Sequence, residues 1–166
     1  MLSDEVTINR FLTNAGNVGA HASRVANREE LDEAIQRAVG DSESIYCPSV
    51  TEVEKDLRLP SNRRTDDYTV ANVCVEEVLG AIAETGSLIS SSHRAKPVQA
   101  SLLPSHHVAL VSSDNIYATL DDFFDSFSES LPTNITLITG PSRTADIELT
   151  LTIGVHGPEQ LTIIVL

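Results

Sequence analysis

The chain is short, acidic and moderately hydrophobic, and these properties already exclude several classes of protein. Its 166 residues fit one domain, and a hydrophobic fraction of 41% is ordinary for a folded globule. Twenty-four acidic against eleven basic residues give a net charge of −13, which repels nucleic acid and anionic lipid. No apolar stretch approaches the ~20 residues that span a bilayer. Acidic rather than basic residues follow Met1, so we expect a cytoplasmic protein without membrane insertion.

Two cysteines, Cys47 and Cys74, bear on redox chemistry and metal binding. They lie far apart and have no neighbouring ligand residues at metal-binding spacing, so we expect no metal site. Free buried thiols in a reducing cytosol are the simpler interpretation, although a disulfide stays open. An iron–sulfur cluster normally takes four cysteines, so this chain is not expected to hold one by itself.

The amino-terminal half predicts a strand followed by a well-defined helix. Residues 18–25 alternate loosely, as is typical of a first strand. Asn27 can cap a helix over 28–39, where apolar residues recur at helical spacing, acids come early and Gly40 provides a stop. The following segments are expected to be short: extended 44–47, a helix within 50–57, a polar loop 59–68, extended 70–75, and a turn or helical piece 76–80.

The carboxyl-terminal half alternates strands with helices. The apolar runs 107–112 and 135–139 predict strands buried on both faces, and 161–166 predicts a last strand. An amphipathic helix is expected over 120–131 and another over about 145–151. This alternation is typical of βαβ units, so we predict an α/β fold with a mostly parallel sheet flanked by helices.

The segment that begins at Gly140 is the strongest candidate for a ligand site. It follows a predicted strand and leads into a predicted helix, which is where open α/β sheets bind ligands. Gly140 allows a tight turn and Ser142 or Thr144 can cap the helix. Arg143 and the free amides favour an anion such as a carboxylate or phosphate. A well-capped helix whose acidic residues, including Asp146, complement its dipole explains the same pattern, and spacing alone does not decide between the two.

Acid–base or nucleophilic chemistry has candidates elsewhere. Glu84 interrupts a long extended stretch, so it is either a turn residue, which the residues favour, or a buried carboxylate able to act as base or nucleophile. His106 and His107 are adjacent and extended, so they point to opposite faces and cannot bind one metal together. His156 lies in a constrained loop and can reach the same crevice as Arg143, although a loop histidine is more often structural.

Four blocks together resemble the LUD domain family, the family of lactate utilisation protein C. In chain order they are Ala83–Ser87, Leu103–Val108, Gly140–Glu148 and Gly154–Pro158. The third block is the most specific of them, whereas the amino-terminal half is similar only in pattern. The resemblance implies a single LUD-type domain over 1–166, in which about the first fifteen residues form a helical extension. It also implies a fold similar to that of the ribose-phosphate isomerase, CoA-transferase and formyltetrahydrofolate cyclo-ligase group.

The resemblance further implies a function in the oxidation of L-lactate to pyruvate, as one component of a multi-protein system. Iron–sulfur clusters would lie on partner proteins, this chain would bind no cofactor, and its ligand would be a small carboxylate or other anion. Glu84 and His156 would be the acid or base. The resemblance leaves the oligomeric state open. The matched blocks mark these residues for ligand binding: Thr85, Gly86, His106, Gly140, Pro141, Ser142, Arg143, Thr144, Asp146 and Gly157.

Two other functions stay open. By analogy of fold alone, Glu84 could be the nucleophile of a stand-alone enzyme that acts on a CoA thioester, a sugar phosphate or a folate. The second alternative is a regulatory module without a ligand, which a filled crevice at the Gly140 loop would favour.

The composition also predicts adaptation to high salt. The only lysines are Lys55 and Lys96, carboxylates are abundant, and aromatic residues make up 4% of the chain. Because counter-ions screen the self-repulsion of such a chain, we expect its thermal midpoint to rise from dilute buffer to multimolar salt. A midpoint that does not change with salt would indicate an ordinary acidic surface instead.

Overall fold

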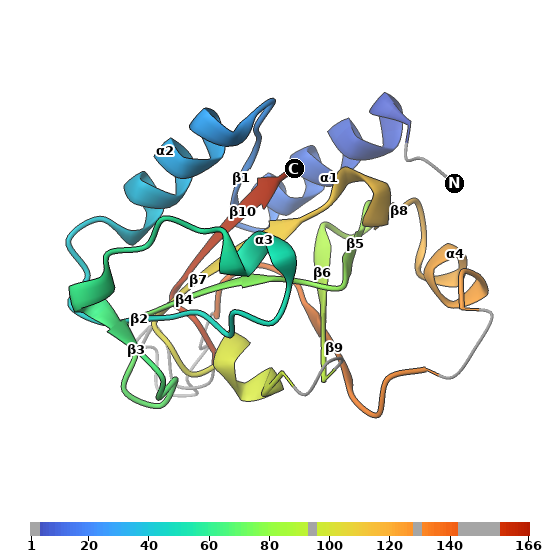
Figure 1. Ribbon diagram of the computed structural model, residues 1–166. Coiled ribbons are helices and arrows are strands. Elements are labelled where there is room, and N and C mark those ends of the chain that lie inside the picture. Colours follow the sequence, from blue (N-terminus) through green and yellow to red (C-terminus); the bar gives the residue numbers. More distant parts are fainter. Residues whose placement is uncertain (1–3, 93–95, 128–130, 143–156) are drawn as a thin grey trace, which may run out of the picture.

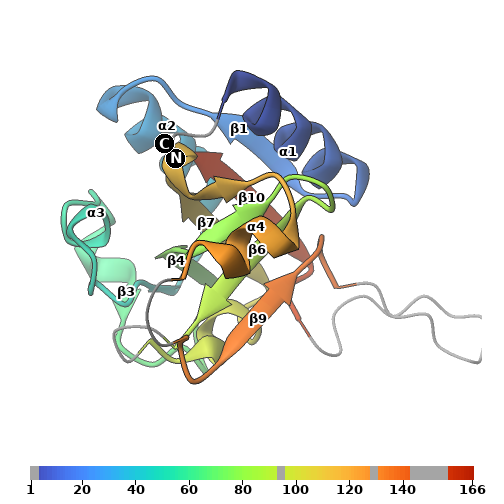
Figure 2. The same cartoon turned by 90° about the vertical axis from the view of Figure 1, so that its right-hand side faces the viewer.

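Two sheets packed face to face form the centre of the molecule (Figures 1 and 2). The computed structural model describes residues 4–92, 96–127, 131–142 and 157–166. In these ranges six parallel strands form the larger sheet, in the order β1 (His21–Arg24), β10 (Gln160–Val165), β7 (His106–Val111), β4 (Val73–Glu77), β2 (Ile45–Tyr46) and β3 (Arg64–Thr65). The predicted α/β fold with a mostly parallel sheet is therefore confirmed.

The smaller sheet is mostly antiparallel and faces the viewer in Figure 2. Its strands follow the order β8 (Ile116–Tyr117), β5 (Gly80–Ile82), β6 (Ser87–Ser91) and β9 (Ile135–Ile138). The helices are α1 (Glu5–Asn17), α2 (Arg28–Val39), α3 (Glu52–Lys55) and α4 (Leu120–Asp125), and short 3-10 turns lie at Ser61–Arg63, Val98–Ser101 and Ser113–Asn115. No helix within the described ranges is long and apolar enough to cross a membrane.

The core has one apolar layer on each face of the larger sheet. On one face, α2 packs through Leu31 and Ile35 against Val108 and Ile164. On the other face, α1 and the inner side of the smaller sheet pack against alternate residues of the same strands, such as Ile163. Strands β7 and β10 are buried on both faces, as long apolar runs in a parallel sheet usually are.

Helix α2 forms where the sequence predicts it. The Asn27 side chain accepts a hydrogen bond from the Glu30 backbone N–H at 3.0 Å, which caps the amino end. Gly40 ends the helix with a φ of +46°, a conformation that favours glycine. The helix bounds of Arg28–Val39 confirm the prediction.

The first helix is more than an extension. Helix α1 begins at an Asp4 cap, whose carboxylate accepts from the Thr7 N–H at 2.7 Å. Its residues Ile8, Phe11 and Ala15 are buried in the core between the two sheets. The spacing of these three residues places them on one face of the helix. The amino-terminal segment is therefore part of the packed fold.

Three sequence expectations are wrong in detail. Residues 76 and 77 continue strand β4 instead of turning, because the Glu76 side chain has polar partners inside the fold. Strand β9 is a partly exposed edge strand that runs antiparallel to β6, rather than a buried parallel strand, and Leu137 is 46% exposed. Helix α4 ends at Asp125, short of the expected 120–131, and Phe124 and Leu131, which an inward apolar face of that helix would bury, are exposed. The helix predicted over 145–151 lies outside the described residues.

The burial of Phe11 predicts a large effect on stability. Its side chain is fully buried between the sheets, whereas Val6 on the same helix is 74% exposed. We expect Phe11→Ala to lower the free energy of unfolding by about 3–5 kcal/mol. The matched Val6→Ala should change it by no more than about 0.5 kcal/mol. Urea unfolding of both variants tests this, and similar losses in the two would contradict the placement of α1.

Candidate functional site

Two turns that carry predicted site residues pack against the carboxyl end of α1. Asn14 donates from Nδ2 to the carbonyl oxygens of Ala83, at 2.8 Å, and Glu84, at 3.2 Å. Gly86 has a φ of +70°, and a Cβ at this position would lie 2.4 Å from the Ala15 nitrogen. The Glu84–Gly86 turn can therefore approach the helix backbone only because residue 86 is glycine.

Gly140 makes the same kind of approach next to this turn. Its φ is +75°, and an added Cβ would lie 2.4 Å from the carbonyl oxygen of Val18, just beyond the end of α1. A chain of three hydroxyls joins the two segments: Thr85 Oγ1 lies 2.7 Å from Ser87 Oγ, which lies 2.7 Å from Thr139 Oγ1. The structure thus brings the Glu84–Gly86 turn and the start of the Gly140 block together.

The other matched blocks lie beside these two. The Ser142 N–H donates to the carbonyl oxygen of Pro158 at 2.7 Å. A Cβ added to Gly157 would lie 3.2 Å from Cβ of Ser142. The Gln160 N–H at the start of β10 donates to the carbonyl oxygen of Ser105, just before β7. We call this region the glycine rim: Thr85–Ser87, Thr139–Ser142, Gly157–Pro158 and His106.

The glycine rim lies at the amino ends of strands β1, β7 and β10. The sequence argument placed the Gly140 loop after a strand of the parallel sheet, at its carboxyl edge. That placement is wrong, because β9 belongs to the smaller sheet and runs antiparallel to β6. An apolar run of four residues has the same appearance in either kind of sheet.

Glu84 is an exposed turn residue. Its carboxylate Oε1 accepts a hydrogen bond from the backbone N–H of Leu120, the first residue of α4, at 3.0 Å. The turn interpretation is confirmed, and the alternative of a buried carboxylate is wrong. The side chain still lies next to the rim, where an acid or base would be accessible to a ligand.

His106 contributes a half-buried imidazole. Its Nε2 lies 2.9 Å from Oγ1 of Thr162. Burial lowers the pKa of His106, and the neighbouring His107 and His21 lower it further because they disfavour a second positive charge. His106 faces α2 whereas His107 is fully buried on the opposite face, as their adjacent positions predict. Among the described residues, no group of three side chains suited to a metal ion occurs.

Part of the predicted site lies outside the described residues. This part comprises Arg143, Thr144, Asp146 and His156. The described rim offers hydroxyls, backbone amides and an imidazole, which can hydrogen-bond a small polar molecule. The roles of Arg143 and His156 stay predictions.

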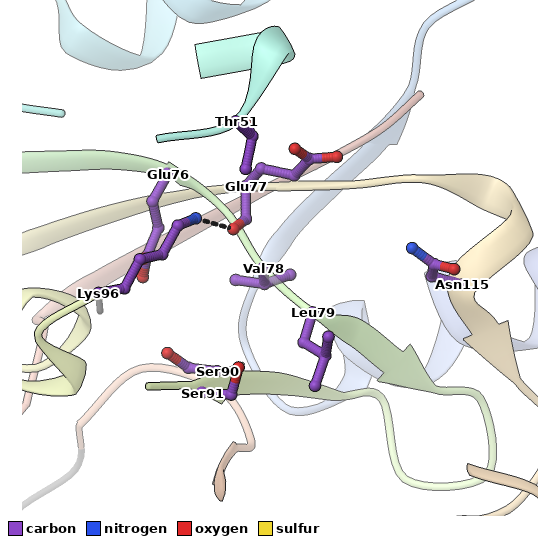
Figure 3. Close-up of a pocket in the computed structure, with 9 residues that line it drawn as sticks. All are labelled: Thr51, Glu76, Glu77, Val78, Leu79, Ser90, Ser91, Lys96 and Asn115. Atoms are coloured by element: carbon purple, nitrogen blue, oxygen red, sulfur yellow. Dashed lines mark hydrogen bonds between the residues drawn. The ribbon is translucent and has the colours of Figure 1, made fainter. Parts of the chain in front are cut away.

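A buried ion pair that the sequence argument missed lies at the carboxyl end of β4 in the larger sheet. Lys96 Nζ is 2.5 Å from Oε1 of Glu54 and donates to the carbonyl oxygen of Glu77 at 2.5 Å (Figure 3). The Glu54 carboxylate has no exposed surface and accepts from the N–H groups of Val50, Thr51 and Glu77. The sequence does hold a signal for it, because Thr51 and Glu54 have the spacing of a capping box.

Glu76 forms a second buried carboxylate beside this ion pair. It accepts a hydrogen bond from Ser101, whose hydroxyl lies 2.8 Å from that of Ser90. His107 Nε2 lies 3.1 Å from Glu76 Oε1, although outside hydrogen-bonding geometry. Burial acts to raise the pKa of Glu76, but His107, Ser101 and Lys96 outweigh burial, so the pKa is lowered and the carboxylate is ionised.

Of the two cysteines, Cys47 donates from its thiol to the carbonyl oxygen of Glu54, at 3.9 Å. Both are free and buried, which confirms the interpretation as reduced thiols. Burial raises the pKa of Cys47 and, more strongly, that of Cys74, so both thiols stay protonated and unreactive at neutral pH.

Comparison with known proteins decides the family. The model of the LUD domain matches residues 61–166, which includes every segment of the glycine rim. The chain belongs to the LUD domain family. The matched residues include every strand of the two sheets except β1 and β2. They do not include the helices α1 to α3.

Individual relatives agree with this assignment. The chain is 39% identical over 104 residues to an uncharacterized protein of Neisseria meningitidis, a match that covers 61% of this chain and 45% of that protein. It is 37% identical over 101 residues to lactate utilization protein C of Macrococcus caseolyticus (57% and 44% of the two chains). Lactate utilization protein C of Deinococcus radiodurans is 31% identical over 146 residues (82% and 68%).

The fold of the whole chain is similar to that of a crystal structure of a DUF162 family protein from Deinococcus radiodurans. The TM-score is 0.70 at 24% identity, and the superposition covers 99% of each chain. In contrast, the LUD domain spans less than half the length of the Neisseria and Macrococcus relatives.

The close approach of Gly140 to α1 predicts a strong substitution effect. Alanine would suffer both a positive φ and a clash with the Val18 backbone, so we expect Gly140→Ala to lower the free energy of unfolding by at least about 2 kcal/mol. Gly16 in α1 has no atom within 4 Å of its would-be Cβ, so Gly16→Ala should instead stabilise by about 0.5–1 kcal/mol. Denaturant unfolding measures both changes. Equal effects would contradict the described contact.

Proposed function

We propose that this LUD domain is a cytoplasmic component of a lactate-utilisation system, in which the glycine rim binds a small carboxylate and iron–sulfur partner proteins take up the electrons. The observation that carries the proposal is the meeting of the described parts of four family blocks at one rim, where Ser87 and Thr139 touch across 52 positions of sequence. Relatives with the name lactate utilization protein C support the choice of substrate class.

The residues of the rim suit a small hydroxy acid. Backbone amides around Gly140 and the guanidinium of Arg143 would hold its carboxylate. The hydroxyls of Thr85 and Thr139 would take its hydroxyl group, since each can both donate and accept. His106 is neutral at physiological pH because its pKa is lowered, but its imidazole faces α2, across the larger sheet from these hydroxyls, so the exposed carboxylate of Glu84 would be the acid or base beside them.

The partner proteins follow from the electron balance of the reaction. Oxidation of L-lactate to pyruvate removes a pair of electrons and a pair of protons. A typical iron–sulfur cluster needs four thiolates. This chain has two cysteines, so the clusters of the proposed system would reside on other chains.

Binding of lactate provides the direct test. L-Lactate should shift the amide resonances of Gly86, Gly140 and Gly157 in a heteronuclear NMR titration of the purified chain. Arg143→Gln should weaken binding about tenfold or more, because a hydrogen bond to a charged group contributes about 1.5–3 kcal/mol. Arg58→Gln, in which the replaced side chain is 81% exposed, is the matched control and should bind normally. Rim amides that do not respond to lactate would contradict the proposal.

Turnover separates an accessory component from a stand-alone enzyme. If the purified chain alone transferred acyl groups from a CoA thioester, and Glu84→Gln abolished this, the chain would be an enzyme in its own right. Under our proposal the purified chain has no such activity. It instead co-elutes with an iron–sulfur protein encoded beside its gene when the two are expressed together.

A further inference from the structure

A cavity of about 180 Å³ lies between the two sheets, where the chain leaves the carboxyl end of β4 and passes through Val78 and Leu79 into β5 (Figure 3). Its polar lining residues include Thr51, Ser90, Asn115 and Lys96, of which Thr51 and Ser90 already use their hydroxyls in hydrogen bonds with the Glu54 N–H and with Ser101. Apolar side chains in a cavity with a few convergent polar groups are the usual composition of a small-molecule site.

This cavity is separate from the glycine rim. Ser90 lies three residues along β6 from Ser87, which corresponds to roughly 10 Å of extended chain. The cavity also adjoins the carboxyl end of β4, whereas the rim adjoins the amino ends of β1, β7 and β10 in the same parallel sheet. The carboxyl edge is where parallel sheets usually bind their ligands.

One end of the cavity presents a hydrogen-bond donor that the fold holds in place. The Lys96 side chain is 9% exposed, and its ammonium donates to Glu54 and to the carbonyl oxygen of Glu77. An ammonium has three hydrogens. Its contacts with the described residues use two of them, and the third is available to a ligand in the cavity that Lys96 lines. Because Glu54 neutralises the ammonium, Lys96 offers a donor rather than a net positive charge.

Glu77 also lines the cavity, and among the described residues no cation pairs with its carboxylate, which lies beside Thr51 in Figure 3. In Figure 3 the carboxylate of Glu77 points away from Lys96. Its contacts with Glu54 and Lys96 use only its backbone N–H and carbonyl oxygen. Together with ionised Glu76, Glu77 leaves the cavity with more negative than positive charge, which repels anions.

We propose that this cavity binds a small amino alcohol, that is, a protonated amine that carries a hydroxyl group. The ligand ammonium faces the Glu77 carboxylate and its hydroxyl accepts the remaining hydrogen of Lys96. Its carbon skeleton lies on Val78 and Leu79. Such a ligand matches both the donor of Lys96 and the acceptor of Glu77.

The test uses three probes with one carbon skeleton and one central hydroxyl: isopropanolamine is cationic, lactamide is neutral and L-lactate is anionic. In NMR titrations of the full chain, isopropanolamine should shift the amides of Val78, Leu79 and Ser90 at the lowest concentration. Lactamide should need more, and lactate should leave them unchanged. Any response of the glycine rim to lactate is read from other amides, so the two proposals succeed or fail separately.

Two variants test the role of Glu77. Glu77→Gln keeps the backbone contacts and should therefore fold, but it should weaken isopropanolamine binding about fivefold and remove its advantage over lactamide. Glu29→Gln, on the exposed surface of α2, is the charge-matched control and should bind as the parent does. The proposal is overturned if no probe shifts the cavity amides, if lactate shifts them as strongly as the amine, or if Glu77→Gln has no effect.

Discussion

The arrangement of the glycine rim depends on the contact between two turns and the carboxyl end of α1. Gly86 and Gly140 both approach backbone atoms of residues 14–18 more closely than any side chain would permit. Asn14 reinforces the contact through its two hydrogen bonds to the Glu84 turn. Because α1 also contacts β1 of the larger sheet and β8 of the smaller sheet and buries one face in their shared core, the same helix positions the rim and completes the core.

Much of the fold was predictable from local patterns. Helix α2 has a cap, an apolar face and a glycine stop, and all three signals lie within its own residues. Strands β7 and β10 are long apolar runs that have few other structural interpretations. Strand β9 was misassigned because its environment depends on its pairing with β6, which lies some fifty residues earlier in the chain. The four residues of β9 do not by themselves indicate that pairing.

The two candidate sites differ in how much of each the sequence reveals. The rim consists of turn glycines and hydroxyls, which form compact motifs that a family resemblance can detect. The buried cavity combines single residues from distant segments, such as Glu54, Glu76 and Lys96, and only the fold brings them together. The sequence predicted a turn or helical piece over 76–80, whereas Glu76 is buried, which is rare for a charged residue unless the fold supplies partners. Those partners come from α3, from β7 and from the segment after β6.

Strand β10 is the last of the described strands to be made, yet it lies between β1 and β7, second from one edge of the larger sheet. During synthesis, the earlier strands therefore expose two unpaired edges until residues 160–165 have left the ribosome. Parallel pairing over such long sequence separations is slow, and open strand edges invite association with other chains. The high negative charge of the chain opposes such association through mutual repulsion between nascent molecules.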